Sequence, residues 1–278
     1  MSQRYYDGIA AEFQEMDDYW DNPYDAATWR MENALITRYL AEDDPILDLG
    51  VGFYPHVEST SGRRLVCVDI SHRSLMVGRQ VHGHLNEAMY FVCADALQLP
   101  FADNTLPGIV AGGELVNHVP GDVLLREVGR VLQPGGRAIL SVGTKWCLDS
   151  LYSVLDAMTG HRIGYSMTRE EALDFVTHAF SSTDVTWEIT PSFNLVITLY
   201  SQLHLKRLLT QARLKIVAAR SLNLLSALIP LPVQQNPKTN KIVQAAARFL
   251  LLLDEAVAGR IPGLRWFGGN VYIVVERR

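Results

Sequence analysis

Along residues 45–143, apolar runs of strand length alternate with stretches that have helical spacing. Residues 71–80 and 121–132 carry apolar side chains three and four positions apart, which is typical of amphipathic helices. Strand–helix–strand units of this length predict a parallel sheet. The predicted strands are residues 46–50, 64–69, 89–94, 106–112 and 137–142.

The segments on either side of this core are predicted to add a helical lid and helical insertions. Residues 26–40 place apolar side chains on one helical face, so the N-terminal part is expected to form the lid. A strand near the C-terminus would complete a Rossmann-like α/β fold with a seven-stranded, mostly parallel sheet and helices on both faces. After residue 143, helices are predicted at 148–159, 168–178 and 201–212, strands at 184–190, 214–219 and 270–276, and a mostly helical stretch at 221–259.

We interpret the 278 residues as a single domain with four parts. These parts are the lid (residues 1–44), the core (45–143), a substrate-side insertion (144–200) and the C-terminal end of the sheet with its helical insertion (201–278). A composition of 48% apolar and 20% charged residues is ordinary for a globular protein and excludes a disordered or coiled-coil chain.

Charge and cysteine content narrow the possible partners. The net charge is −5, whereas nucleic-acid-binding proteins carry a basic excess, so no nucleic acid partner is expected. The three cysteines are scattered, which implies no metal site or disulfide framework and fits the cytoplasm. The N-terminus lacks the apolar run of a signal peptide, and the most apolar stretches are too short or too charged for stable membrane insertion.

Glycines follow the first predicted strand in the sequence Asp48-Leu49-Gly50-Val51-Gly52. Without a Cβ, they let the backbone pass close to a ligand, although a glycine after a strand is often only a turn. A P-loop would need a following Gly-Lys-Ser/Thr, which is absent. The dinucleotide-binding fingerprint would need a third glycine, which is absent as well. The motif alone therefore leaves a nucleotide-like site and an ordinary turn open.

Aspartates end the second and third predicted strands. Asp69 lies about 20 residues after the glycine turn, where a doubly wound fold places a carboxylate that accepts bonds from ribose hydroxyls. Its alternative is a helix cap. Asp95 ends the next strand, where it can border an adenine amino group or serve as a turn aspartate.

The order and spacing of these features resemble the class I S-adenosylmethionine-dependent methyltransferases, in the ubiquinone/menaquinone-type (methyltransferase type 11) group of small-molecule enzymes. The matching stretches are ILDLGVG, LVCVDIS, FVCADALQLPFADNTLPGIVAGGELVNHV and LLREVGRVLQPGGRAILSV. The resemblance implies S-adenosylmethionine as the cofactor and S-adenosylhomocysteine as the product. It also implies a set of cofactor-binding residues, which are Tyr6, Asp48, Gly50, Gly52, Asp69, Ile70, Asp95, Ala96, Gly112 and Gly113.

The resemblance gives individual roles to members of this set. Asp48 would orient the glycine turn and the methionine end of the cofactor, and Asp69 would hold the ribose. Ile70 would pack on adenine, whose edge Asp95 would border. Tyr6 would close over the sulfonium, because aromatic faces attract a cation.

The chain departs from the family pattern at Phe53-Tyr54-Pro55, where a third small residue is usual. The bulky Tyr54 is therefore expected to reshape the loop. This departure keeps a non-catalytic relative among the alternatives.

His118 and Glu114 are the candidate catalytic residues, because both follow the fourth strand near the expected site of transfer. A general base is needed only when the acceptor holds a proton of high pKa. His118 is either that base or a loop histidine bonded to the backbone. Glu114 either orients the acceptor or is a solvated loop carboxylate.

Aromatic residues of the lid and of the substrate-side insertion predict an apolar or aromatic acceptor pocket. The candidates for this pocket are Tyr5, Trp20, Trp146 and Tyr165. Aromatic side chains also belong to ordinary cores, so that alternative stays open for each of them.

A broad apolar surface is predicted in the C-terminal insertion, over residues 222–231 and 249–253. Three interpretations are open for it. It packs on the core, it forms a homo-oligomer interface, or it contacts a membrane or a lipid-like substrate.

These observations together predict methyl transfer from S-adenosylmethionine to a small, hydrophobic or natural-product-like acceptor. Methylation of oxygen, nitrogen or carbon stays open. The alternatives are a non-catalytic cofactor-binding scaffold that regulates a partner, and a nucleotide-sugar or nicotinamide enzyme on a similar fold. A protein methyltransferase is also open, although no Asn-Pro-Pro-Tyr-type motif follows the fourth strand.

Overall fold

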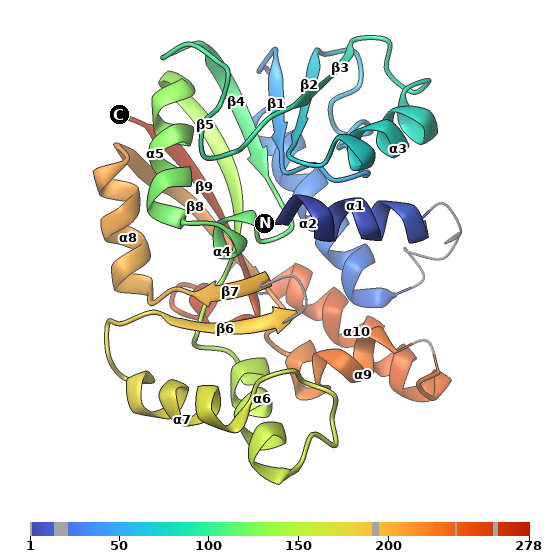
Figure 1. Cartoon of the computed structure of the whole chain (residues 1–278), viewed down its shortest axis with the longest axis vertical. Helices are drawn as coiled ribbons and strands as arrows, with labels where there is room; N and C mark the ends of the chain where they lie inside the picture. Colours follow the sequence, from blue (N-terminus) through green and yellow to red (C-terminus); the bar gives the residue numbers. More distant parts are fainter. Residues whose placement is uncertain (1, 14–21, 191–194, 237, 258–260) are drawn as a thin grey trace.

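The computed structural model describes residues 2–13, 22–190, 195–236, 238–257 and 261–278 (Figure 1). Its centre is a seven-stranded sheet in the order β3-β2-β1-β4-β5-β9-β8. The strands are β1 (Ile46–Leu49), β2 (Leu65–Asp69), β3 (Met89–Cys93), β4 (Leu106–Ala111), β5 (Leu132–Gly143), β8 (Leu214–Leu222) and β9 (Asn270–Arg277).

Pairing within this sheet is mostly parallel. β1 pairs with β2 and β4, β2 with β3, and β4 with β5, all in parallel, whereas β9 is antiparallel to both β5 and β8. The last strand therefore lies inside the sheet and completes it. This arrangement confirms the predicted seven-stranded, mostly parallel Rossmann-like fold.

Helices cover both faces of the sheet (Figure 1). Because successive strand residues point to opposite faces, Val271 and Ile273 of β9 pack with α5 and α8, whereas Tyr272 and Val274 pack with α2 and α10. The helices are α1 (Ser2–Phe13), α2 (Pro23–Tyr39), α3 (His72–His82), α4 (Leu115–His118), α5 (Gly121–Val131), α6 (Leu148–Thr159), α7 (Arg169–His178), α8 (Gln202–Gln211), α9 (Leu231–Gln235) and α10 (Lys241–Val257).

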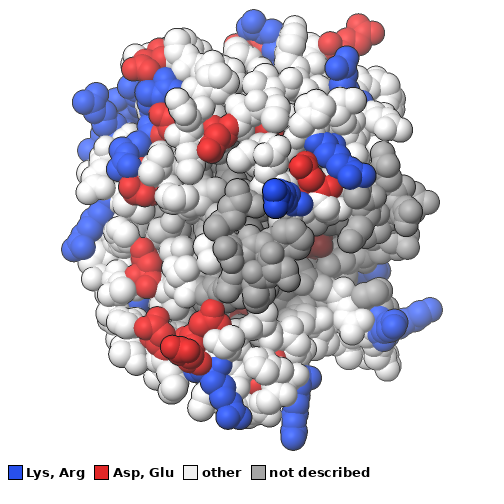
Figure 2. Space-filling model, viewed as in Figure 1, with Lys and Arg blue, Asp and Glu red and all other residues white. Residues whose placement is uncertain are grey.

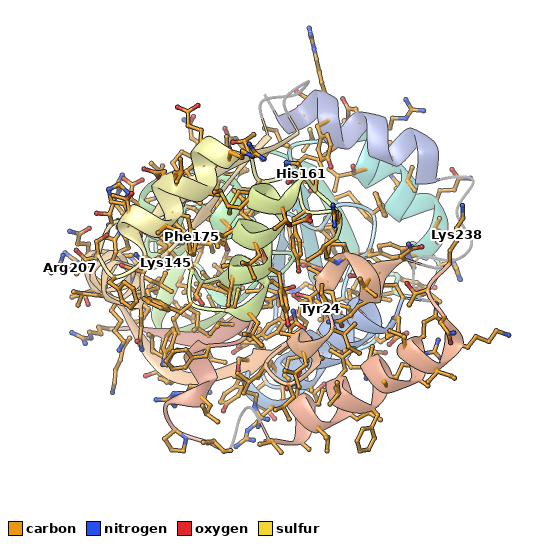
Figure 3. All side chains as sticks on the ribbon, turned by 90° about the horizontal axis from the view of Figure 1, so that it is seen from below. Tyr24, Lys145, His161, Phe175, Arg207 and Lys238 are labelled. Carbon is orange, nitrogen blue, oxygen red and sulfur yellow. The ribbon has the colours of Figure 1, made fainter. Side chains whose placement is uncertain are left out.

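The helix of the lid begins earlier than its apolar pattern predicts. α2 starts at Pro23 rather than at residue 26, because Asn22 caps it and accepts a hydrogen bond from the Tyr24 amide at 2.9 Å. Tyr24 lies where α2 meets the C-terminal helices in Figure 3. This cap places the first turn of α2 beside the sheet.

Two strand boundaries differ from the prediction. β5 begins at Leu132, which pairs with Leu106, and its register then shifts across the Pro-Gly-Gly sequence before Arg137 pairs with Gly108. β8 continues to Leu222 because it pairs with β9 over its whole length. The stretch predicted as mostly helical therefore begins with the end of a strand.

A second, two-stranded sheet was only half predicted. β6 (Val185–Thr190) matches the expected strand, but β7 (Leu195–Leu199) was not predicted, and the two strands pair in antiparallel fashion. An apolar stretch as short as β7 has no pattern of its own that separates a strand from a loop.

The α6–α7 pair forms the lower part of Figure 1 and has its own small core, which includes Met167 and Phe175. Lys145, beside α7 in Figure 3, is buried and donates hydrogen bonds to the backbone carbonyls of His178, Ser181 and Thr183. These bonds tie the end of α7 to the strand β5.

The apolar C-terminal segment is divided between the interior and the surface. Leu222 and Leu251 belong to the core, whereas Ile242, Phe249 and Leu252 of α10 are exposed. Acidic and basic side chains are interspersed over the face drawn in Figure 2. Within the described ranges, no helix combines the length and the apolar character needed to cross a bilayer.

Candidate active site

A cavity of about 690 Å³ opens at the carboxyl ends of the parallel strands β1, β2, β3 and β4. This edge is where open α/β sheets bind their ligands. All ten residues implied as cofactor-binding line the cavity, and His118 lines it as well. The structure thus brings these positions together, while their individual roles stay predictions.

The glycine turn has a backbone that only glycine adopts readily. Gly50 and Gly52 have φ values of +69° and +57°. A Cβ on Gly50 would lie 2.9 Å from a Leu115 methyl carbon, so the turn also needs glycine for packing. The Gly52 amide donates to Asp69 at 2.9 Å, which links the turn to the end of β2.

Asp69 uses both of its oxygens inside the protein and still lines the cavity. It accepts hydrogen bonds from the amides of Gly52 at 2.9 Å and Ser71 at 2.8 Å. Burial raises the pKa of Asp69, although these amides oppose the shift. The cap of α3 is Ser71 itself, whose hydroxyl accepts from the Ser74 amide at 3.0 Å. Each Asp69 oxygen keeps a lone pair for a further donor.

Asp95 forms the local turn that was one of its two interpretations. Its carboxylate accepts a hydrogen bond from the Leu97 amide at 2.8 Å. It also lines the cavity beside Ala96, so the turn does not exclude a contact with a ligand.

Phe53 and Tyr54 are accommodated in the loop without filling the cavity, which both of them line. Their rings meet edge to face with centroids 5.1 Å apart. The small residue that makes room lies in α3, because a Cβ on Gly78 would be 3.3 Å from the Phe53 backbone.

A buried ion cluster, which the sequence did not reveal, joins α2 to the end of β1. His56 Nδ1 lies 3.0 Å from Asp48 Oδ2, and its Nε2 lies 3.2 Å from Glu32 Oε2. The His56 amide donates to the same Asp48 oxygen at 2.9 Å. All three side chains are nearly inaccessible to solvent and line the cavity.

The cluster holds His56 in its charged form. Burial alone would lower the pKa of His56, but Asp48 and then Glu32 raise it to about 10. The Trp29 ring stacks on the imidazole with centroids 4.4 Å apart. We call Asp48, His56 and Glu32 the ion cluster.

Glu32 also reaches the glycines that follow β4. The Gly113 amide lies 3.4 Å from Glu32 Oε1 in hydrogen-bonding geometry. A Cβ on Gly112 would be only 2.7 Å from that oxygen, so glycine is required there for α2 to approach. The ion cluster thus connects three elements that border the cavity.

His118 presents a free ring nitrogen. Its Nδ1 is buried and has no hydrogen-bond partner in the described part of the chain, while the ring bonds to the Val196 backbone. Burial lowers the pKa of His118, and the bond to Val196 opposes this only in part. The side chain is therefore neutral near pH 7, with Nδ1 as a proton acceptor.

Glu114 does not line the cavity. The Glu114 backbone amide donates to the Ser141 hydroxyl at 2.7 Å. The Glu114 backbone has a φ of 55°, in the left-handed region. Burial, followed by the charges of Glu32 and Asp149, raises the pKa of Glu114 to about 7. Its predicted contact with the acceptor has no support in this placement.

The aromatic candidates for the acceptor pocket lie elsewhere. Tyr5 packs against Tyr6, with centroids 5.2 Å apart, and Trp146 packs against Phe180, with centroids 5.1 Å apart. The Tyr165 hydroxyl donates to Asp149. None of Tyr5, Trp146 and Tyr165 is among the described residues that line the cavity, so their part in an acceptor pocket stays a prediction without support from this cavity.

The remaining pocket candidate, Trp20, falls outside the described residues. On the described chain, further lining residues come from α2, from the segment after α4 and from β7. These residues are Asp25, Thr28, Trp29, Glu32, Val119, Pro120 and Val196. The sequence did not reveal this part of the lining, because its residues have no common motif.

A second cavity of about 530 Å³ shares His118, Val119, Pro120 and Val196 with the first. Its polar side chains already pair with one another, Asp184 with His204 and Asp122 with Arg126. We therefore assign the candidate site to the first cavity.

Residues 47–140 match the family described as "Methyltransferase domain". The demethylmenaquinone methyltransferase of Corynebacterium urealyticum is 38% identical over 104 residues, which are 37% of this chain and 43% of that protein. Over residues 47–140, this chain is thus similar to methyltransferase domains. The resemblance seen in the sequence is thereby confirmed for the methyltransferase domain, and this chain spans less than half the length of that relative.

Solved structures share the fold of the methyltransferase domain. The 1,6-didemethyltoxoflavin-N1-methyltransferase of Burkholderia thailandensis, solved with 1,6-didemethyltoxoflavin and S-adenosylhomocysteine, has a TM-score of 0.54 and 15% identity, with 100% of this chain and 90% of that chain covered. The geranyl diphosphate C-methyltransferase of Streptomyces coelicolor A3(2), solved with Mg²⁺, geranyl diphosphate and S-adenosyl-L-homocysteine, has a TM-score of 0.52 and 14% identity, with coverages of 90% and 78%.

The ion cluster predicts a pH-dependent loss of stability in the variant His56→Gln. Removing the cation leaves two buried carboxylates unpaired, which should lower the free energy of unfolding by about 3–5 kcal/mol near neutral pH. The pKa of His56 is about 10 in the folded state against 6.5 for a free side chain. The stabilisation is therefore complete below pH 6.5 and declines as the pH rises to 10.

Urea unfolding of both proteins between pH 6 and 10 measures this difference. The exposed His84 supplies the matched control, His84→Gln, which should track the wild type at every pH. A difference between wild type and His56→Gln that stays constant over this range would contradict a charged His56.

Proposed function

We propose that this protein transfers a methyl group from S-adenosylmethionine to a small-molecule acceptor and releases S-adenosylhomocysteine. The observation that carries the proposal is the cavity at the strand ends, where glycines, the ion cluster and Asp69 meet. S-adenosylmethionine would supply an electrophilic methyl group on a cationic sulfur.

The lining suits that cofactor in charge and in shape. The described residues of the cavity include five carboxylates, and lysine and arginine are absent from them. A carboxylate-lined cavity favours a ligand with a positively charged sulfur and an ammonium group. A Cβ on Gly52 or Gly113 would meet no described protein atom within 4 Å, so both of these lining glycines leave open space for a ligand.

We propose that Asp69 binds the ribose hydroxyls and that Ile70, Asp95 and Ala96 surround the adenine. Asp69 already accepts two backbone amides, which fix the direction of its free lone pairs. Tyr6 borders the same cavity from α1. These assignments rest on the resemblance together with the placement of the residues.

We propose His118 as the general base for an acceptor that must lose a proton. Its neutral ring has Nδ1 free, in the wall of the cavity that also includes Val119 and Val196. Much of the remaining catalysis would come from holding the two reactants in line within the cavity.

Several further properties of the protein stay predictions. They include the division of the chain into a lid, a core and two further parts, a small-molecule partner in place of nucleic acid, a homo-oligomer formed through the C-terminal helices, and a cytoplasmic location. The non-catalytic scaffold remains the rival, and turnover with any acceptor would exclude it.

The role of Asp69 is tested by calorimetric titration of S-adenosylhomocysteine into the variant Asp69→Ala. The variant removes the carboxylate that we expect to accept hydrogen bonds from the ribose hydroxyls. The free energy of S-adenosylhomocysteine binding should therefore become about 1–3 kcal/mol less favourable. Asp103→Ala, at an exposed position, is the control and should bind as the wild type does. Unchanged affinity in a folded Asp69→Ala would remove Asp69 from the site.

The role of His118 is tested by the pH dependence of turnover, measured on the first acceptor found by a mass-spectrometric screen. His118→Ala should lower kcat about 10²–10⁴-fold with little change in cofactor affinity. Because burial lowers the pKa of His118, wild-type kcat should fall only at a pH below the usual titration range of histidine. His204→Ala, in the second cavity, should retain kcat, and equal kcat in His118→Ala would exclude the base.

A further inference from the structure

The charge of the cavity wall restricts the acceptor. Carboxylates are the only ionised side chains offered to a ligand by the described lining residues, because His118 is neutral and His56 is already paired. The lining carboxylates are Asp25, Glu32, Asp48, Asp69 and Asp95.

The positive charge of His56 is already paired with carboxylates and is not available to an acceptor. Both of its ring nitrogens point to carboxylates, Nδ1 to Asp48 at 3.0 Å and Nε2 to Glu32 at 3.2 Å. A carboxylate or phosphate on the acceptor would enter this wall without a cationic partner among the described residues. Burying an unpaired anion is costly, so the wall disfavours such an acceptor.

Asp25, Asp69 and Asp95 form no ion pair with a described residue, and of these three only Asp25 lies on α2. It lies in the first turn of α2 and lines the cavity together with Thr28 and Trp29 of the same helix. Its carboxylate accepts a hydrogen bond from Asn22 at 3.0 Å and interacts with the Gln235 side chain. Both partners are neutral, and no described lysine, arginine or histidine forms an ion pair with Asp25.

Asp25 is still charged at neutral pH. Burial raises its pKa to about 6, and the bond to Gln235 limits the shift. The chain segment between α1 and α2, residues 14–21, contains four acidic residues and no lysine or arginine, so its composition offers no compensating cation. Asp25 is thus a half-buried negative charge with a place for a cation in the cavity beside it.

We infer that the methyl acceptor carries a basic nitrogen, and that Asp25 binds its positive charge. This inference rests on the proposed function and specifies the class of acceptor. Acceptors that carry a carboxylate or a phosphate are disfavoured by the same wall. Asp25 is a specificity-determining residue in this account and takes no part in the transfer.

The test compares two probes of nearly the same shape and opposite charge, phenethylamine and 3-phenylpropionate. Ligand-observed NMR titration, with the protein saturated with S-adenosylhomocysteine, gives the two affinities. The amine should bind about tenfold more tightly, as expected for one charge-assisted contact. In Asp25→Asn the affinities for the two probes should differ by no more than about threefold, because asparagine keeps the shape of the aspartate side chain and lacks its charge.

Glu87→Gln is the matched control, because it makes the same change in net charge at an exposed position outside the cavity. It should keep the wild-type preference. Tighter or equal binding of the carboxylate, no measurable binding of the amine, or a preference that survives in Asp25→Asn would each overturn the inference.

The same titrations separate this inference from the function on which it rests. Failure of S-adenosylhomocysteine to bind the wild type would contradict the proposed methyl transfer itself. Binding of S-adenosylhomocysteine without the expected amine preference would contradict only the acceptor class and the role of Asp25.

Discussion

A charged imidazole between two buried carboxylates is the interaction on which the arrangement of the cavity depends. His56 binds Asp48, at the end of β1, and Glu32, in the middle of α2. A buried charge is tolerated only when it is paired, so this cluster fixes the distance between the helix and the strand. Glu32 in turn lies against Gly112 and Gly113, where only a glycine leaves room for it.

The negative character of the cavity follows from this pairing. Among the described lining residues, the cluster pairs the one charged histidine and still carries an excess negative charge, to which Asp69 from β2 and Asp25 from α2 add. Such a site suits a cationic methyl donor and, beside Asp25, a basic acceptor. His118, neutral because it is buried, is the general base that we propose for an acceptor that must lose a proton.

Features encoded within one short segment could be predicted from the sequence, and features made by distant segments could not. Asp69 and Gly52 were found because each follows a strand with its own apolar pattern. Glu32 and His56 are 24 positions apart, and only the packing of α2 brings them together. The Tyr165 hydroxyl is bound to Asp149, a partner 16 positions away that no local pattern indicates.

A crystal structure of the protein with S-adenosylhomocysteine tests the central claim most directly. The account predicts the ribose hydroxyls at Asp69, the adenine beside Asp95 and the thioether sulfur in the part of the cavity between Glu32 and His118. A ligand bound outside this cavity, or in the reverse direction along it, would contradict the assignment of the site and the acceptor class inferred from it.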